Sequence, residues 1–286
     1  MIARAAGHDG ILCSSSNKLS ADVVKGLPDT IHILSTFSVG FEHIDLDACG
    51  ARGIAVTNTP DVLSAATADM AFMLLLTASR RASEADRMVR AGLWRGWAPT
   101  QLLGKGMQGK RLAIIGMGGI GREVAARARA FGMDIHYHNR SRLAPELEQG
   151  AVYYDSAEKL LAVADFLSFN CPMSPEMAHF LNAQRIAMLP DEAVVVNTAR
   201  GGLIDDEALI AALKSGKVMD LRIRGKGVGG LGGGVSNDSR VSGTVVNDTQ
   251  SALVLFSRSS HSILHVDQPL KAGDMALNTH THSPVT

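Results

Sequence analysis

Short apolar runs alternate with segments of helical periodicity over the first 218 residues of this chain. Met70, Met73, Leu74 and Thr77 recur at helical spacing and predict a long helix over residues 64–91. The apolar runs predict strands at 31–35, 53–57, 111–115, 134–138, 151–154, 165–170 and 193–198. Strands that alternate with helices favour an α/β fold with a parallel, doubly wound sheet.

The pattern changes after Met219. Residues 220–234 read DLRIRGKGVGGLGGG, which is charged and then rich in glycine, so we expect only a poor strand there. The single aromatic residue from Asp220 to Thr286 is Phe256. Because this composition buries too little apolar area to offset the loss of chain entropy, residues 225–286 are predicted to be mostly irregular, with a short strand or helix near SALVLFS. A shift of the reading frame in the gene would produce such an abrupt change.

Charge and cysteine content exclude several classes of protein. Lys plus Arg and Asp plus Glu number 28 each, and no basic cluster has interleaved aromatics, so nucleic acid is not an expected partner. The longest apolar run, at 70–76, is too short to cross a bilayer, and the first residues lack the apolar segment of a secretory signal. Cys13, Cys49 and Cys171 form neither a disulfide framework nor a metal motif. We therefore expect a cytoplasmic protein without a metal or a membrane partner.

The motif that says most about function follows the strand predicted at 111–115. Gly116, Gly118 and Gly121 satisfy GxGxxG, with Gly119 and Ile120 inside the motif, and a helical pattern follows. The first glycine permits a tight turn, the second lets the backbone approach a pyrophosphate, and the third lets the helix pack on the strand. Free N–H groups at the helix N-terminus would then bind the anion. The motif predicts a dinucleotide-binding loop; the alternative is a glycine turn with a purely structural role.

The residues after the next predicted strand bear on the choice of cofactor. An NAD-binding protein is expected to have a carboxylate here, which accepts a hydrogen bond from the ribose 2′-hydroxyl. This chain has Asn139, Arg140, Ser141 and Arg142 instead. Because no acid would repel a 2′-phosphate and two guanidinium groups could pair with it, the sequence favours NADP over NAD. Alternatively, the arginines are solvated residues that open the next helix.

A third candidate segment follows the strand predicted at 193–198. Thr198, Ala199 and Arg200 lie at its carboxyl end, which is where α/β sheets bind ligands. A guanidinium group at this position can bind a carboxylate through two hydrogen bonds and polarise an adjacent carbonyl. The alternative for Arg200 is a loop residue in an ordinary ion pair.

Several segments together resemble the D-isomer-specific 2-hydroxyacid dehydrogenase family, and in particular its glyoxylate/hydroxypyruvate reductases. The resemblance covers residues from about 10 to 218, and its pieces are STFSVGFEHIDL, GIAVTNTPDVLSAATADMAFMLLL, GLWRGW, GKRLAIIGMGGIG, HYHNRSRL, DFLSFNCPMSPEMAHFLN and VVVNTARGGLIDDEALIAALKSGKV. It implies a Rossmann-type sheet with a smaller flavodoxin-like substrate domain, and an active site between the two. The substrate domain would comprise residues 1–82, short of its first strand and helix and hence incomplete; the dinucleotide-binding domain would comprise 83–218, and an atypical tail 219–286.

The resemblance also implies roles for individual residues. Backbone N–H groups around Val39 and Gly40 would bind the substrate carboxylate, and Arg200 would orient the substrate. Cys171 and Pro172 would line the cofactor together with residues 198–200, although Cys171 could also be a small buried apolar residue. The expected reaction is the NAD(P)H-dependent reduction of a small 2-oxo acid such as glyoxylate or hydroxypyruvate. A homodimer is expected, with the arm that carries Trp94 and Trp97 contributing to it.

Two family residues have no match in this chain. The family uses a His as proton donor and a Glu that holds it, in motifs like PHIGSAT and DVFxxEP, and neither motif occurs here. The last Glu is Glu207, and the tail histidines His261, His265, His280 and His282 lie in no matching context. We therefore expect slow turnover, and the alternative function is a non-catalytic dinucleotide-binding or NAD(P)-sensing protein.

Overall fold

The computed structural model describes residues 2–224, 245–246 and 254–256, which form two compact units. One unit contains the described residues up to Pro60 together with the strand at 254–256, and the other contains those from Asp61 onward. The sequence placed a domain boundary at residue 82. The structure groups residues 61–82 with the second unit, because the helix in this segment packs on helices and strands of that unit. The assignment of the units to substrate and cofactor stays a prediction.

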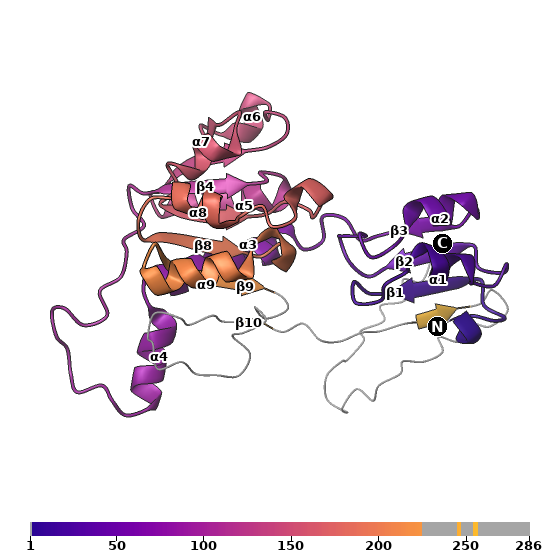
Figure 1. Cartoon of the computed structure of the whole chain (residues 1–286), viewed down its shortest axis with the longest axis horizontal. Coiled ribbons are helices and arrows are strands. Elements are labelled where there is room, and N and C mark those ends of the chain that lie inside the picture. The colour runs from indigo at the N-terminus through magenta and orange to yellow at the C-terminus, as the bar shows by residue number, and fades with distance from the viewer. Residues whose placement is uncertain (1, 225–244, 247–253, 257–286) are drawn as a thin grey trace, which may run out of the picture. The chain divides into compact units, whose positions relative to one another are not determined.

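The second unit is built on a seven-stranded sheet with the order β10-β9-β8-β7-β4-β5-β6 (Figure 1). Every neighbouring pair in this sheet is parallel. The strands are β4 (Arg111–Ile115), β5 (Asp134–His138), β6 (Val152–Tyr153), β7 (Phe166–Phe169), β8 (Ala193–Asn197), β9 (Val218–Arg224) and β10 (Val245–Val246). The parallel, doubly wound sheet confirms the predicted α/β class.

Helices cover both faces of this sheet. One face packs against α3 (Ser64–Ser79) and α5 (Gly119–Ala130), and the other packs against α7 (Ala157–Leu161), α8 (Ala183–Met188) and α9 (Asp206–Ser215). Because side chains alternate along a strand, Leu112 and Ile114 of β4 face the first layer while Ala113 and Ile115 face the second. The short helix α6 (Pro145–Glu148) and the 3₁₀ turns Pro175–Met177 and Gly201–Leu203 complete the connections.

Strand β9 corrects the expectation that residues after Met219 make only a poor strand. Val218 is buried, and β9 pairs with β8 from Ala193↔Val218 to Asn197↔Ile223, with one irregularity near its start. The backbone ladder on a buried neighbouring strand outweighs the weak intrinsic preference of this segment, since strand preference depends strongly on context. The sheet therefore continues past the point where the sequence pattern ends.

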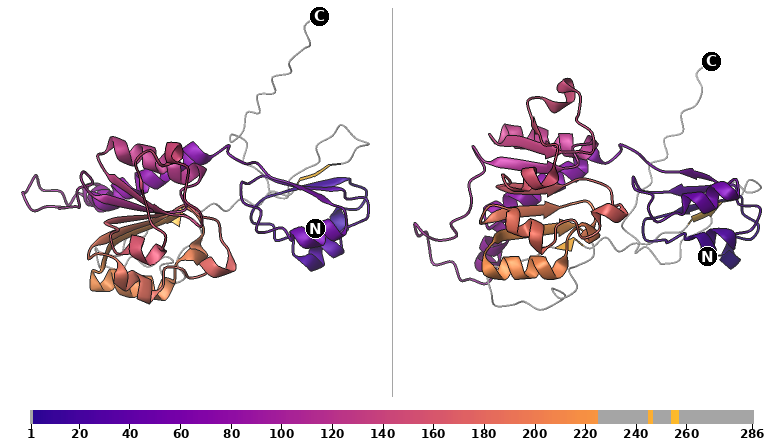
Figure 2. Two further views of the ribbon diagram at one scale, coloured as in Figure 1. Left: turned by 90° about the horizontal axis from the view of Figure 1, so that it is seen from above. Right: turned by 45° about the horizontal axis from the view of Figure 1, so that its top comes forward.

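The long helix predicted at 64–91 is broken in two. Arg81 has a left-handed φ of 52°, which ends the first helix before α4 (Ala82–Arg90) begins. Leu74 is buried as predicted, but Met73 is 47% exposed. After α4 the chain makes a long excursion, which Figure 2 shows, and it returns where the Lys105 N–H donates to the Ser79 carbonyl at 2.8 Å. No helix within the described residues is long and apolar enough to cross a membrane.

The first unit is a smaller four-stranded sheet with the order β11-β1-β2-β3. The strands β1 (Gly10–Cys13), β2 (Ile33–Thr36) and β3 (Ala55–Thr57) are parallel, and β11 (Val254–Phe256) runs antiparallel to β1. It also has helices α1 (Ala21–Lys25) and α2 (Leu46–Ala51) and a 3₁₀ turn at Ile2–Arg4. Strand β11 confirms the short element expected near SALVLFS. Residues 225–244, 247–253 and 257–286, including the four tail histidines, lie outside the described residues.

Candidate functional site

The topology of the seven-stranded sheet has its switch point at the carboxyl end of β4, and open α/β sheets form a binding crevice at such a point. From β4 the chain proceeds outward to β5 and β6, and then crosses to β7 on the opposite side of β4. The loops that follow β4 and β7 therefore leave the sheet in different directions, and open α/β sheets bind ligands at such a switch point. The glycine motif and the segment that begins at Asn170 are these two loops.

Two of the three motif glycines, Gly116 and Gly121, are required by their surroundings. Gly116 has a φ of 93°, and a Cβ there would lie 2.7 Å from the backbone nitrogen of Cys171. A Cβ on Gly121 would overlap the Gly116 carbonyl oxygen, so only glycine lets α5 pack this closely on β4. In contrast, a Cβ on Gly118 would have no atom within 4 Å. The structure thus places free space above the glycine whose backbone would approach a pyrophosphate.

The N-terminus of α5 faces this space without a capping side chain. Gly118 is the N-cap residue, and no side chain accepts a hydrogen bond from the first turn. The first N–H groups of a helix have no partner within the helix and carry its positive dipole end, which favours an anion. Gly119 lies beside Ser64, whose hydroxyl would be 3.1 Å from an added Cβ, and Ile120 packs its side chain against the core.

Two buried polar atoms at the carboxyl ends of β7 and β8, the next two strands from β4 in the sheet order, lack a hydrogen-bond partner. They are Oδ1 of Asn170 and Oγ1 of Thr198, and they follow the neighbouring strands β7 and β8. An unpartnered buried polar atom is costly, so such a pair at the ligand-binding edge of a sheet fits a polar ligand that completes the hydrogen bonds. Thr198 was predicted from the sequence. Asn170 was not, although its position directly after a strand at the same edge was a usable signal.

The turn that carries Arg200 is shaped by Asn197, which the sequence reasoning also missed. Asn197 is fully buried; its Nδ2 donates to the Arg200 carbonyl at 2.8 Å, and its Oδ1 accepts from the Ala199 N–H at 3.0 Å. Ala199 is half-buried, whereas the side chain of Arg200 is exposed and donates to the Ala199 carbonyl at 3.2 Å. The buried amide fixes the backbone from which the guanidinium group extends.

Cys171 lies against Gly116 and is half-buried. Burial raises the pKa of its thiol to about 11, so the thiolate is scarce at neutral pH. This protonation state argues against a nucleophilic role and is compatible with a packing role at the edge of the crevice. Pro172, the next residue, is exposed.

Asn139 holds the glycine loop from the neighbouring strand. Its Oδ1 accepts a hydrogen bond from the Met117 N–H at 2.6 Å, while the Gly116 N–H donates to the His138 carbonyl at 3.1 Å. These two contacts extend the β4–β5 pairing into the loop. Asn139 therefore has a role in the loop's conformation that the sequence reasoning did not identify.

The two arginines predicted to read the 2′-phosphate differ in their surroundings. Arg142 donates from Nε and Nη2 to the carboxylate of Glu148 at 2.8 and 3.1 Å, and Glu148 also accepts from the Tyr137 hydroxyl at 2.6 Å. These contacts lower the pKa of the buried Glu148 carboxyl to about 2, with the Arg142 hydrogen bond as the main cause. Arg140 is exposed and makes no hydrogen bond or ion pair with the described part of the chain, and Ser141 is exposed as well.

In the first unit, the predicted substrate loop has all three of its carbonyl groups engaged. The carbonyls of Ser38, Val39 and Gly40 accept from the Thr59 N–H at 3.1 Å, from Asn58 Nδ2 at 2.8 Å and from Ser38 Oγ at 2.6 Å, respectively. Within the described residues, none of the three N–H groups of this loop has an acceptor. A loop with consecutive free N–H groups is suited to bind an anion.

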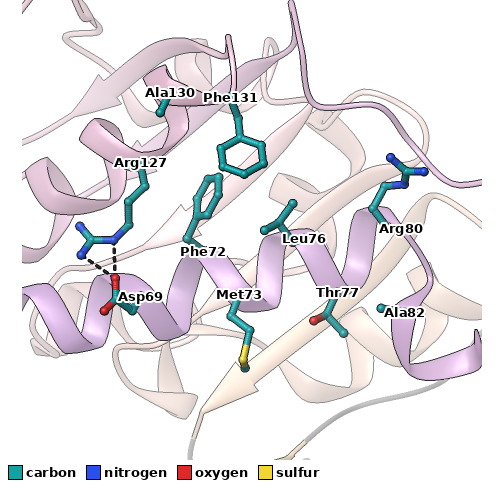
Figure 3. Close-up of a pocket in the computed structure, with 10 residues that line it drawn as sticks. All are labelled: Asp69, Phe72, Met73, Leu76, Thr77, Arg80, Ala82, Arg127, Ala130 and Phe131. Carbon is teal, nitrogen blue, oxygen red and sulfur yellow. Dashed lines mark hydrogen bonds and ion pairs between the residues drawn. The ribbon is translucent and has the colours of Figure 1, made fainter. Parts of the chain in front are cut away.

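A separate apolar groove of about 550 Å³ lies on the outer side of α3 and α5 (Figure 3). The rings of Phe72 and Phe131 meet there with centroids 4.8 Å apart, and Arg127 pairs with Asp69 at its rim. No residue predicted to bind cofactor or substrate lines this groove. Among the described residues, no group of His, Cys, Asp and Glu side chains is arranged to hold a metal ion.

Comparisons with known proteins agree with this geometry. Residues 72–222 match the family model described as D-isomer specific 2-hydroxyacid dehydrogenase, NAD binding domain. The chain is 44% identical over 220 residues to a glycerate dehydrogenase of Hyphomicrobium methylovorum. The aligned region covers 76% of this chain and 68% of that protein. It is 42% identical over 187 residues to a glyoxylate reductase of Thermococcus litoralis, which covers 63% of this chain and 56% of the relative.

Two solved structures are similar in fold. A glyoxylate reductase from Paecilomyes thermophila has a TM-score of 0.74 at 39% identity, over 83% of this chain and 72% of that one. A D-lactate dehydrogenase from Aquifex aeolicus, in complex with NAD and lactic acid, has a TM-score of 0.72 at 29% identity, over 78% of this chain and 66% of that one.

Proposed function

This chain belongs to the D-isomer specific 2-hydroxyacid dehydrogenase family, and we propose from that premise that it binds NADP(H) and reduces a small 2-oxo acid of the glyoxylate or hydroxypyruvate type. The observation that carries the proposal is the crevice at the end of β4, where an open glycine loop meets two unpartnered buried polar atoms. The relatives, a glycerate dehydrogenase and a glyoxylate reductase, support this class of substrate.

We assign the dinucleotide to the residues that surround this crevice. The N–H groups after Gly118 would bind the pyrophosphate. The orphaned Asn170 Oδ1 would accept a hydrogen bond from the bound nucleotide, and the Thr198 hydroxyl would donate or accept one. Pro172 and Ala199 flank the same edge. Arg140 would contact the 2′-phosphate, which is the basis for NADP over NAD.

The substrate is assigned to Arg200 and to the backbone of Val39 and Gly40. Arg200 would bind the carboxylate and polarise the carbonyl group that is reduced, and the loop N–H groups would bind carboxylate oxygens. The cofactor, when bound, supplies the hydride. The carbonyl oxygen must also gain a proton, and a placed general acid typically contributes about 10²–10⁴-fold. Because no family His or Glu motif follows Glu207, we expect this chain to turn over more slowly than a relative that has both.

The test is NADPH oxidation with glyoxylate and with hydroxypyruvate, beside the Hyphomicrobium relative. We expect a slow reaction that Arg200→Ala lowers by a further factor of about 10². Lys214→Ala removes one positive charge from the exposed side of α9 and serves as the matched control, with no expected change. A protein without NADPH binding and without Arg200-dependent oxidation would overturn the proposal. A rate equal to that of the relative would overturn the expectation of slow turnover.

A second candidate function is a dinucleotide-binding protein without turnover, which the absence of both family motifs from the sequence favours. Binding of NADPH with no oxidation in the presence of either acid would select it. This outcome would leave the assignment of the crevice intact and remove the catalytic role of Arg200.

We also propose a homodimer to which the arm contributes. Trp94 and Trp97 are 57% and 82% exposed, and large exposed aromatic side chains are typical of interfaces. Light scattering on the full chain and on the Trp94→Ala/Trp97→Ala double variant tests this. A wild-type monomer would contradict it, as would an unchanged dimer in the variant.

A further inference from the structure

The substrate loop of the first unit is held by a chain of side-chain hydrogen bonds that begins at His43. His43 Nε2 lies 2.9 Å from the Thr36 hydroxyl, which lies 2.8 Å from the Ser38 hydroxyl, and Ser38 Oγ is 2.6 Å from the Gly40 carbonyl. We propose that His43 and Thr36 are positioning residues that fix this loop in the conformation that exposes its N–H groups to the substrate carboxylate. The proposal rests on the function proposed above.

The direction of each hydrogen bond follows from the last one. A carbonyl oxygen only accepts, so the Ser38 hydroxyl donates its one proton to Gly40. Ser38 Oγ must then accept from the Thr36 hydroxyl, which spends the one proton of Thr36. Thr36 Oγ1 in turn accepts from His43, which requires a proton on Nε2. These hydrogen bonds thus donate in one direction, from the imidazole to the loop, and Cys13 Sγ also lies 4.0 Å from His43 Nε2.

Two residues of this relay, His43 and Thr36, are anchored in the unit. The His43 carbonyl accepts from the Leu19 N–H at 2.7 Å, which fixes the backbone that carries the ring. Thr36 is the last residue of β2 and is 1% exposed, so loss of its hydroxyl would leave polar groups without partners in a buried place. The relay therefore connects the rigid sheet to the loop.

Besides this relay, two hydrogen bonds hold the loop, from the Thr59 N–H to the Ser38 carbonyl and from Asn58 Nδ2 to the Val39 carbonyl. None of its residues has a left-handed φ, so glycine freedom at Gly40 does not define the turn. With the Gly40 carbonyl bonded to Ser38 Oγ, and the other two carbonyls bonded to residues after β3, the N–H groups remain the only backbone groups of the loop without a partner in the described residues. Release of the Gly40 carbonyl would let the Gly40–Phe41 peptide rotate, and this would remove a restraint on the neighbouring Val39 and Gly40 N–H groups.

The test uses the full chain and oxamate, an unreactive analogue of a 2-oxo acid. Thr36→Val is nearly isosteric but breaks the relay, and it is expected to weaken oxamate binding about tenfold, as loss of a buried hydrogen bond does. Thr36→Ser keeps the hydroxyl and should restore affinity to within about twofold. Thr57→Val is the matched control, since it removes the Thr57–Ser35 hydroxyl contact, a similar bond in the same sheet that does not reach the loop.

A double-mutant cycle with His43→Phe separates a relay from independent effects. If both residues act through one chain of hydrogen bonds, the double variant should bind oxamate no more weakly than Thr36→Val alone. Additive losses, or equal affinity of Thr36→Val and wild type, would overturn the proposal. The thermal midpoint and NADPH affinity of each variant show whether it is folded. If His43→Phe is misfolded, the comparison of Thr36→Val with Thr36→Ser tests the proposal instead.

Backbone ¹⁵N relaxation without ligand distinguishes failure of the relay from failure of the proposed function. Thr36→Val should raise the mobility of Val39 and Gly40, whereas Thr36→Ser and Thr57→Val should not. A wild-type protein that binds no oxamate contradicts the proposed substrate site, and the relay is then judged by this mobility alone. Unchanged mobility of Val39 and Gly40 in Thr36→Val would overturn the relay, whether or not the protein binds oxamate.

Discussion

Two loops of this protein present backbone N–H groups toward a predicted anion, and they are shaped in different ways. The loop after β4 depends on glycine, because Gly116 needs a φ of 93° and Gly121 lies against a carbonyl oxygen. The loop after β2 has no left-handed residue and is held by hydrogen bonds from His43, Thr36 and Asn58. The first loop keeps its shape because its crowded glycine positions have no room for a Cβ. The second keeps its shape because side chains donate hydrogen bonds to its carbonyl groups.

This difference predicts different responses to substitution. A side chain added at a crowded glycine clashes with backbone, which cannot move aside cheaply. Removal of a hydroxyl from the other loop leaves space and frees one carbonyl, so the loop loosens while the unit keeps its core.

Gly116→Ala and Gly118→Ala should separate folding from binding in the glycine loop. At Gly116 a left-handed φ and a Cβ 2.7 Å from Cys171 combine, so we expect a loss of about 2–5 kcal/mol in the free energy of unfolding. At Gly118 nothing lies within 4 Å of an added Cβ, so stability should change by less than about 0.5 kcal/mol while NADPH affinity falls at least about tenfold. Thermal unfolding and NADPH fluorescence measure both quantities. Equal stability losses in the two variants would contradict the assigned roles.

The arginines near the glycine loop should also behave differently from one another. Arg140→Ala is expected to lower the preference for NADPH over NADH about tenfold, because its exposed guanidinium group makes no hydrogen bond within the described residues and interacts only electrostatically with Glu176. Arg142→Ala should lower it by a factor of about two, since Glu148 already occupies that guanidinium group. Titration of both variants with both cofactors gives the ratios. Tighter binding of NADH to the wild type would refute the NADP assignment.

The smallest effect expected is a loss of stability in acid. The pKa of Glu148 is lowered from 4.5 to about 2, so its contribution is complete above about pH 4.5 and is lost as the pH falls through about 2. Glu158, which pairs with Arg185 and also has a pKa of about 2, responds in the same direction. Glu148→Gln should therefore show a shallower fall of the thermal midpoint between pH 5 and 2.5 than the wild type. Parallel curves would show that Glu148 does not carry this dependence.

The glycine loop could be predicted from the sequence because each glycine has a local structural reason: a tight turn, the approach of a pyrophosphate, or close packing of the helix on the strand. Gly116, Gly118 and Gly121 show at fixed spacing which backbone atoms must approach one another. Asn170, Asn197 and Asn139 were missed or given another role, because their contacts join segments that lie tens of residues apart in the chain or depend on burial. The relay at His43 was missed although its residues are close in sequence, because its contacts depend on how the chain folds after β2. Its members are three residue types that are common on any surface.

Prediction also failed where context outweighed local preference. Residues 220–224 are charged, yet they form part of β9 because β8 offers a buried partner strand. The helix over 64–91 has continuous helical periodicity, and no Gly or Pro marked its break at Arg81. A pattern of apolar spacing records which residues favour a helix and contains no information on where the chain must turn.

The most direct test of the central claim is an NMR titration of the ¹⁵N-labelled full chain with NADPH. We expect the amide signals of Gly118, Gly119 and Ile120 to shift first and to saturate together. The Asn170 side-chain amide signal should shift with them. The Gly118→Ala variant should require at least about tenfold more NADPH to reach the same shifts. Saturable shifts elsewhere in the chain, with these four signals unmoved, would contradict the assignment of the β4 crevice as the dinucleotide site.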